Sequence, residues 1–280
     1  MILATRLFLA GLAFWALAAT ASAADKIGNC ELTGAKGSAR IATPAVPGQL
    51  TVAVSLPAPV WWNGDTPEAI KDGMEYCLAA EIAWRAGYDK LKVVAVDFVP
   101  LVSGEVKDYD LALSEVSITE ERKKVVDFSV PYFNSDIGVL TLSASPVTQK
   151  TVRKVTVGIQ QGTTGAAFAL DVLKVKDYNV YAERADLLKA LSDEDVVAVL
   201  TDTSITLSAE TASAGKIKVV GQYKTGEIYG AVYPKGNANN PTLDKIMKAI
   251  IDDGTMKKLA AKYLVAAWGK DPGSIPYFKP

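Results

Sequence analysis

Short apolar runs alternate with segments of helical periodicity along most of the chain. The runs cover residues 50–56, 91–98, 109–113, 137–143, 155–159, 195–201, 216–220 and 228–233. They are rich in β-branched residues and short for helices, so they predict strands. Helical spacing of apolar positions lies in residues 73–87, 163–175, 184–192, 204–215 and 240–264. This alternation indicates an α/β fold with mainly parallel sheets that are covered on both faces.

Two extended β segments suggest that the chain crosses between two lobes. Residues 131–145 and 226–236 both combine aromatic and polar positions with long β runs, and they bracket an α/β unit. We therefore predict a first lobe made of residues 48–136 and 230–280 and a second lobe of residues 137–229. The final helical segment has apolar residues on one face and is expected to pack on the first lobe.

The chain begins with a predicted signal peptide and a strap. Residues 1–23 combine Arg6, an apolar stretch and the small-x-small sequence Ala21-Ser22-Ala23, which is typical of a cleaved secretory signal. A retained membrane anchor is the alternative, although the apolar run is short for a membrane span. Residues 24–47 are rich in Gly, Ala, Ser and Pro and predict an irregular strap. We expect an exported, soluble protein.

Composition and charge exclude several classes of function. The 280 residues include 30 basic and 31 acidic side chains, for a net charge of −1, so the basic surface of a nucleic-acid binder is missing. The chain contains no histidine, which excludes His-based catalytic triads and His-ligated metal sites. We expect neither a metal nor a cofactor.

The chain has two cysteines, Cys30 and Cys77. An even pair in an exported protein predicts one disulfide, and two buried free thiols are the alternative. The loop between them would span 77 − 30 = 47 positions, to which the chain-entropy relation assigns about 4 kcal/mol of stabilisation.

Candidate binding residues follow the predicted strands, at the strand ends where open α/β sheets bind ligands. They combine aromatic surface, hydroxyl groups, a cation and anions from both halves of the chain. The set comprises Trp61, Trp62, Phe98, Ser114, Glu115, Ser117, Arg122, Thr163, Thr164 and Asp202. The segment that carries Arg122 contains no nucleophile–base pair, so the set favours binding over covalent catalysis.

Arg122 is the most informative member of this set. It lies in the first turn of a short helix that Thr119 is expected to cap, where the helix dipole disfavours a cation. An arginine is tolerated at such a position when an anion meets its guanidinium fork. The anion is either a ligand carboxylate or an intramolecular partner, for which Glu115, Glu120 and Asp127 are the candidates.

Two other candidates have competing structural roles. Residues 160–168 form a strand-to-helix turn whose free N–H groups can bind a carboxylate or phosphate, but Thr163 can equally serve as the helix cap. Asp202 ends a strand and can bind a cation or cap the following helix. These alternatives remain open at this point.

The segment 110–133, DLALSEVSITEERKKVVDFSVPYF, resembles the family 3 periplasmic solute-binding proteins, the polar amino-acid receptors of ABC importers. The pieces VGIQQGTT, VLTD, GAVYPKGN and IIDDGTMKKLAAKYL follow in that family's order and spacing. The resemblance covers nearly all of the chain after the signal. It implies the type II periplasmic binding protein fold, in which two Rossmann-like lobes joined by two hinge strands close on a ligand.

The resemblance also implies residue roles. Arg122 is similar to the arginine that binds a ligand α-carboxylate, assisted by Ser117 and the N–H of Thr164, and Asp202 matches the acceptor of the α-ammonium. Other contacts would come from a strand-end loop and an aromatic side chain: Ser114, Glu115 and Phe98.

The chain departs from the family pattern in two places. The loop LPAPVWW lacks the acidic residue that many relatives use for basic ligands, and its double tryptophan could stack on a bulky or quaternary ligand. Of the two, we expect Trp61 to face the cleft. Glu115 occupies a position that is often small and would add an anion facing the ligand.

The function implied by the resemblance is a periplasmic, monomeric receptor. It would capture an amino acid or a derivative and deliver it to the permease of an ABC importer in the inner membrane, without being an enzyme. Two alternatives remain: an accessory subunit that keeps the fold without binding a free ligand, and a dehydratase-like enzyme on the same scaffold.

Overall fold

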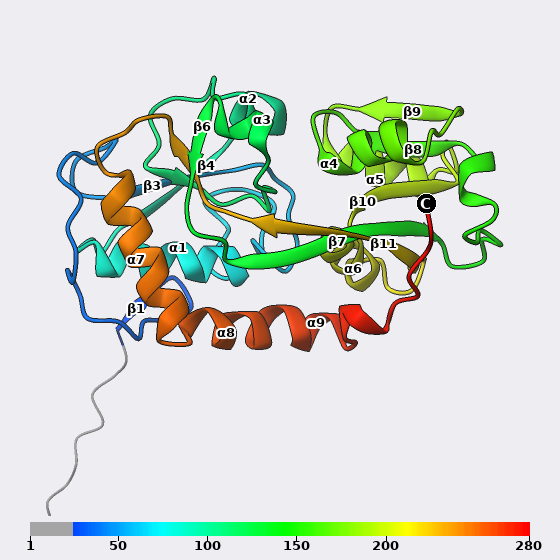
Figure 1. The fold of residues 1–280 in the computed structure, drawn as a ribbon. Helices are drawn as coiled ribbons and strands as arrows, with labels where there is room; N and C mark the ends of the chain where they lie inside the picture. Colours follow the sequence, from blue (N-terminus) through cyan, green and yellow to red (C-terminus); the bar gives the residue numbers. More distant parts are fainter. Residues whose placement is uncertain (1–24) are drawn as a thin grey trace, which may run out of the picture.

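A computed structural model describes residues 25–280, so the predicted signal peptide lies outside the described residues. This part of the chain forms two α/β lobes, each built around a five-stranded sheet, which lie side by side in Figure 1. The two-lobed α/β prediction is confirmed. The sheets are mixed, because strands linking the lobes run antiparallel to their neighbours.

The sheet of the first lobe has the order β4-β3-β5-β12-β6. Its strands are β3 (Leu50–Val54), β4 (Leu91–Ala95), β5 (Leu111–Ala112), β6 (Val126–Phe128) and β12 (Val232–Pro234). The first three are parallel to one another, and β12 runs antiparallel between β5 and β6. Every residue of β3 is buried, as expected for a central strand covered on both faces.

Helices of the first lobe come from both ends of the chain. They are α1 (Met74–Arg85), α2 (Phe98–Val102), α3 (Glu120–Lys123), α7 (Asn240–Asp252) and α8 (Thr255–Ala260). α1 and α7 pack in one cluster with β3, and the apolar residues predicted on one face of α7 are the buried ones. α3 is capped by Thr119, whose side chain accepts a hydrogen bond from the N–H of Arg122, as predicted.

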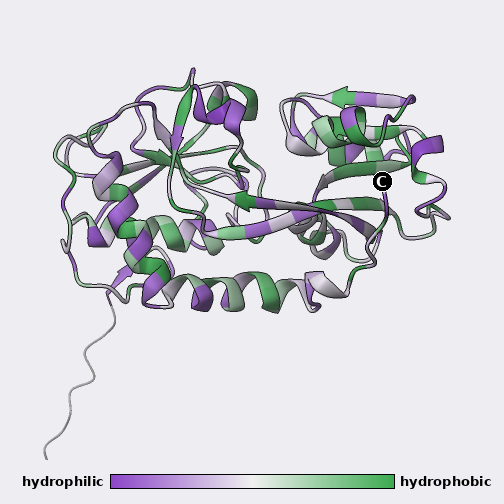
Figure 2. Cartoon of the chain, viewed as in Figure 1, coloured by the Kyte–Doolittle hydropathy of each residue, from purple (hydrophilic) through white to green (hydrophobic). Residues whose placement is uncertain are grey.

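The sheet of the second lobe has the order β11-β7-β10-β8-β9. Its parallel strands are β10 (Ala198–Asp202), β8 (Val157–Gln160) and the edge strand β9 (Tyr178–Tyr181). The helical segments are η1 (Val152–Lys154), α4 (Thr164–Ala167), η2 (Phe168–Val172), α5 (Arg184–Ser192) and α6 (Thr203–Ala212). Figure 2 shows β10 in the hydrophobic colour, whereas the short exposed helix α3 is hydrophilic. The core therefore lies between the helices and these strands.

Two long strands join the lobes. β7 (Phe133–Leu142) and β11 (Ile217–Tyr229) pair antiparallel from Phe133 opposite Tyr229 to Leu142 opposite Ile217. They run between the two groups of elements in Figure 1. The sequence pattern predicted separate strands at 216–220 and 228–233, but pairing with β7 keeps residues 217–229 extended through two register shifts.

The C-terminal end returns to the second lobe, which corrects the assignment of all of residues 230–280 to the first. η3 (Ala261–Val265) and α9 (Ala266–Trp268) lead to η4 (Pro272–Ser274) and a tail. The backbone N–H of Gln222 donates to the carbonyl of Pro276, 2.9 Å away, and Phe278 lies over Gly221. A Cβ at Gly221 would come within 2.3 Å of that ring, so a larger residue there would require Phe278 to move.

The strap is tied to α1. Its first residues form the small hairpin of β1 (Lys26–Ile27) and β2 (Cys30–Glu31), and Cys30 and Cys77 form a disulfide with Cα atoms 5.3 Å apart. The predicted disulfide is confirmed. Farther along, the backbone N–H groups of Thr33 and Gly34 donate to the carboxylate of Glu81 at 3.0 and 2.7 Å.

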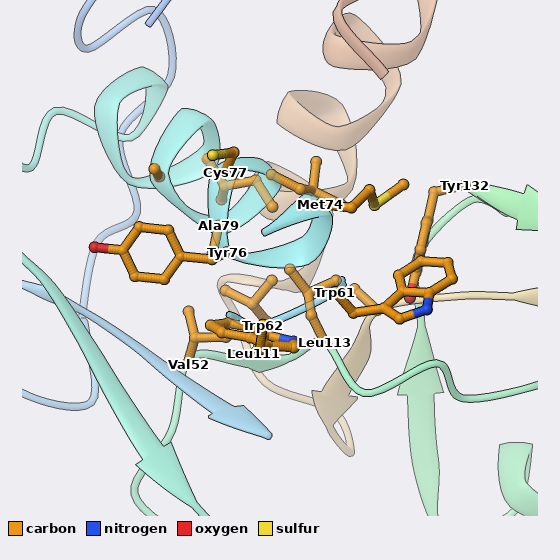
Figure 3. Close-up of a cluster of buried hydrophobic side chains, with 14 of the residues drawn as sticks. Val52, Trp61, Trp62, Met74, Tyr76, Cys77, Ala79, Leu111, Leu113 and Tyr132 are labelled. Carbon is orange, nitrogen blue, oxygen red and sulfur yellow. The ribbon is translucent and has the colours of Figure 1, made fainter. Parts of the chain in front are cut away.

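Both tryptophans of the loop after β3 belong to the core of the first lobe. In Figure 3 Trp62 lies beneath α1 with Val52 and Leu111, and Trp61 lies on the side of Tyr132. Neither indole is exposed. No helix in the described part of the chain is long and apolar enough to span a bilayer.

Candidate functional site

The polar residues predicted to bind a ligand converge where the two lobes meet. A small cavity of about 10 Å³ lies there, and residues of both lobes line it. Its walls are Phe98, Glu115, Ser117, Arg122, Gln160, Thr163, Thr164, Arg184, Asp202 and Ile205. Three predicted residues, Ser114, Trp61 and Trp62, are not among them. The lobes are therefore in contact around this cavity.

Ser114 and Trp61 are buried next to the site but do not line the cavity. The hydroxyl of Ser114 accepts a hydrogen bond from the backbone N–H of Ser55 at 3.0 Å. The indole of Trp61 packs edge-on against Phe133 and Tyr229, with ring centres 5.1 and 6.0 Å apart. Because both partners lie on the strands that join the lobes, Trp61 supports the hinge in this structure.

Arg122 reaches across the boundary between the lobes. It is 8% exposed, and its guanidinium donates to the carbonyl of Ser117 in the first lobe and to that of Gly162 in the second, at 2.7 and 2.9 Å. Its Cζ lies 5.5 Å from the ring centre of Phe98. These contacts hold one edge of the guanidinium and direct the residue to the cavity wall.

The intramolecular carboxylates considered for Arg122 pair with other cations. Glu115 binds Arg184, Glu120 binds Lys123 and Asp127 binds Lys235, at 2.8, 2.7 and 2.8 Å. Within residues 25–280, Arg122 forms no ion pair. Burial lowers the pKa of its guanidinium, and the charges of Asp202 and Glu227 oppose that effect. Arg122 is thus a buried cation available to an anion.

Asp202 is the carboxyl group of the second lobe that lines the same cavity as Arg122. It ends β10 and occupies the N-cap position of α6, yet its side chain makes no capping hydrogen bond. Instead, its carboxylate accepts from the hydroxyl of Tyr229. Burial and the charge of Glu227 raise the pKa of Asp202 to about 8. The carboxyl group is therefore largely protonated near neutral pH, and a ligand cation beside it would favour its ionised form.

Thr163 and Thr164 have different roles. Thr163 caps α4, because its hydroxyl accepts a hydrogen bond from the backbone N–H of Ala166. This is the helix-cap role that the sequence offered as the alternative to ligand binding. The hydroxyl of Thr164 donates to Glu227 at 2.7 Å, and Ser117 donates to the same carboxylate oxygen at 2.5 Å. Glu227 on β11 therefore connects a hydroxyl of each lobe.

Glu115 and Arg184 form a second connection between the lobes. Arg184 Nη1 lies 2.8 Å from Glu115 Oε1, and the two side chains are 7% and 0% exposed. Glu115 has a φ of 52°, a left-handed conformation uncommon outside glycine. Burial raises the pKa of Glu115, and Arg184 opposes the shift. Beneath it, burial and the charge of Glu115 raise the pKa of Glu75 to about 7.

The sequence did not single out Arg184, Ile205 or Glu227. A signal for Arg184 was present, because it stands in the first turn of α5, where the helix dipole disfavours a cation. The same argument identified Arg122. Glu227 lies on the exposed part of a long strand and carried no comparable signal.

A larger groove of about 590 Å³ lies elsewhere, along β6 and α7 of the first lobe. Its charged residues already have partners, because Lys235 binds Asp127 at 2.8 Å and Asp244 accepts from the N–H of Val130 at 2.7 Å. Its walls come from the first lobe and the end of β11. We therefore take the small cavity as the candidate site, because Arg122 and Asp202 line it without ion-pair partners in residues 25–280.

The raised pKa values of the buried carboxyl groups predict that the free energy of unfolding falls as pH rises. Their folded-state pKa values of about 8 for Asp202 and about 7 for Glu75 lie above the unfolded values of roughly 4. Between those limits the folded protein retains protons that the unfolded chain has released, so the free energy of unfolding decreases with pH and levels off above about pH 8.

Thermal unfolding at about pH 5 and about pH 8 measures this effect, and the melting temperature should be higher at the lower pH. Asp202→Asn cannot ionise and should reduce the difference. A melting temperature that increases between the two pH values would contradict the prediction.

Comparison with known proteins gives one family and several relatives. The profile of the bacterial extracellular solute-binding proteins, family 3, matches residues 50–266. An octopine-binding periplasmic protein of Rhizobium meliloti is 25% identical over 255 residues, which cover 72% of this chain and 85% of that protein. The L-cystine-binding protein TcyJ of Escherichia coli (strain K12) is 27% identical over 205 residues, which cover 69% of this chain and 74% of that protein.

Solved structures agree with the sequence relatives. An ancestral arginine-binding protein bound to glutamine superposes with a TM-score of 0.68 at 27% identity, covering 78% of this chain and 98% of the other. Since the family profile spans most of the chain and both the fold and the relatives agree with it, this chain belongs to the bacterial extracellular solute-binding proteins, family 3.

Proposed function

We propose that this protein is a periplasmic receptor that captures an amino acid or a close derivative between its lobes and delivers it to an ABC importer permease. Export would follow from the signal peptide predicted at residues 1–23. The receptor would act as a monomer and would release its ligand chemically unchanged.

The observation that carries the proposal is a cation and a carboxyl group that line one cavity from opposite lobes, neither with an ion-pair partner in residues 25–280. Arg122 from the first lobe and Asp202 from the second both line it, and both are buried. A carboxylate suits the arginine fork and an ammonium suits the aspartate. A zwitterion with both groups, as in an amino acid, would complement the two residues at once, which supports an amino acid or a close derivative as the ligand.

Contacts across the cavity support a mechanism of closure. Arg122 contacts Gly162, Glu227 joins Ser117 to Thr164, and Arg184 binds Glu115. Each contact would be lost if the lobes separated by hinge bending at β7 and β11. A ligand that bridges Arg122 and Asp202 would add to these contacts and favour the closed form, which the permease would recognise.

The names of the relatives are consistent with this ligand class. They are described as binding octopine, L-cystine and, for the ancestral protein, arginine or glutamine. All of these ligands carry amino-acid groups, and their side chains differ widely. The relatives therefore support the ligand class without choosing a side chain for this chain.

Mass spectrometry of small molecules that co-purify with the protein, followed by a thermal-shift screen of amino acids and derivatives, tests the proposal. At a hundredfold excess over Kd, a ligand contributes about 2.7 kcal/mol, which raises the melting temperature of a protein of this size by roughly 5–10 °C. A chemically altered ligand after incubation would favour the enzyme alternative.

One observation favours the accessory-subunit alternative. The closed cavity is about 10 Å³, enough for about one water molecule, because the chain's own side chains fill the cleft. A screen in which no compound shifts the melting temperature, with a folded protein confirmed by circular dichroism, would support that alternative.

A further inference from the structure

An arginine of the second lobe enters the cleft and binds the first lobe. Nη1 of Arg184 donates to Oε1 of Glu115 at 2.8 Å and to the carbonyl of Pro57 at 3.4 Å. Both acceptors belong to the first lobe, and the arginine side chain is 7% exposed. Its guanidinium therefore lies in the space between the lobes.

The side chain of Arg184 occupies part of the space between the lobes and so reduces the volume of the cavity. The remaining cavity of about 10 Å³ is lined by Arg184 together with Glu115, Arg122 and Asp202. Small-molecule sites usually measure a few hundred Å³. A ligand held by Arg122 and Asp202 must therefore share its surroundings with the guanidinium of Arg184.

Glu115 is built to receive a cation. Its backbone is held at a φ of 52°, and its N–H donates to Glu75 Oε1 at 3.0 Å. Oε1 of Glu115 accepts from Arg184, whereas Oε2 is buried without a hydrogen-bond partner in residues 25–280. A carboxylate can bind a guanidinium through both oxygens. Here Arg184 uses one of them.

We propose that Arg184 is a built-in counter-ion that keeps guanidinium and ammonium side chains away from Glu115, so that the cleft selects amino acids without a cationic side chain. This inference rests on the proposed function and specifies its ligand. A second cation beside Arg184 would meet a like charge in a buried, weakly screened site. Specificity of this kind comes from repulsion of the wrong ligand.

Removal of Arg184 should reverse the selectivity. Arg184→Ala leaves Glu115 buried without its counter-ion and vacates the volume of an arginine side chain at the same place. A ligand guanidinium can then pair with both oxygens of Glu115. The variant is expected to gain binding of L-arginine.

Calorimetry and thermal shift on the full mature chain, with L-arginine and L-citrulline as probes, test this expectation. Citrulline has the same shape as arginine but a neutral end group. The wild-type protein should not be stabilised by L-arginine, whereas Arg184→Ala should bind it at least about tenfold more tightly than L-citrulline.

Three further variants distinguish the effect of the Glu115 charge from the effect of the volume that Arg184 vacates. Arg184→Ala combined with Glu115→Gln vacates the same volume without the charge and should lose the preference for arginine over citrulline. Arg184→Lys keeps a cation and should retain the exclusion. Arg153→Ala removes an exposed arginine of the same lobe and should behave like the wild type.

The proposal is overturned if wild-type protein binds L-arginine as tightly as its best neutral amino acid, or if Arg184→Ala gains no preference for it. If Arg184→Ala is unfolded alone, L-arginine should restore its fold, and failure to do so counts against the proposal. Gain of arginine binding in the variant, with no amino acid bound by the wild type, would sustain the role of Arg184 as a counter-ion that blocks Glu115, but would reject both the selection of neutral amino acids and the proposed receptor function.

Discussion

Replacing Arg122 with alanine is expected to abolish ligand binding while the protein remains folded. Arg122 is a buried cation with no ion pair in residues 25–280, and it faces the cavity together with Asp202. Truncating one member of a buried, hydrogen-bonded charge pair costs about 2–5 kcal/mol. Since about 1.4 kcal/mol corresponds to a tenfold change, the affinity measured by calorimetry should fall by roughly thirtyfold to a few thousandfold.

Two variants control for other effects at Arg122. Lys123→Ala alters the next residue of α3, which is exposed and paired with Glu120, and should leave affinity unchanged. Arg122→Lys keeps the charge without the planar fork and should bind with intermediate affinity. Unchanged affinity in Arg122→Ala for the ligand that the wild type binds would rule out the proposed role of this residue.

Removing the disulfide is expected to give a large loss of stability. Cys30→Ser combined with Cys77→Ser opens a loop with a sequence separation of 47 residues, which in the chain-entropy relation corresponds to about 4 kcal/mol. For a protein of this size, each kcal/mol shifts the melting temperature by roughly 2–4 °C, so a decrease of about 8–16 °C should appear in calorimetric scans.

A reducing agent provides the matched control for the disulfide. It should lower the melting temperature of the wild type towards that of the double serine variant and leave the variant itself unaffected. Equal melting temperatures of the wild type and the double variant under oxidising conditions would show that the crosslink does not stabilise the folded state.

Local patterns were sufficient for most of the elements and for the candidate residues. Apolar runs predicted β3, β8 and β10, and helical spacing predicted α1 and α7, because burial of one face leaves a periodic trace in the sequence. The cap of α3 by Thr119 was predicted for the same local reason. Strand ends indicated Arg122, Ser117 and Asp202, which the fold brings to one cavity.

Contacts between distant segments were not available from such patterns. The pairing of Arg184 with Glu115 joins residues 69 positions apart, and the hydroxyl contacts of Glu227 exist only because the lobes meet. The C-terminal tail reaches the second lobe because Gly221 leaves room for Phe278. None of these contacts produces a periodic signal within its own segment.

The sequence by itself determined the α/β class, the crossing of the chain between two lobes, the pair of cysteines and the residue types that surround the cleft. These features depend on periodicity, composition and strand ends, which are local. Only the tertiary structure decided which charges remain unpaired. In residues 25–280, Arg122 and Asp202 line the cavity without ion partners, whereas Glu115 is neutralised by Arg184, because the geometry of the closed lobes selects the pairs.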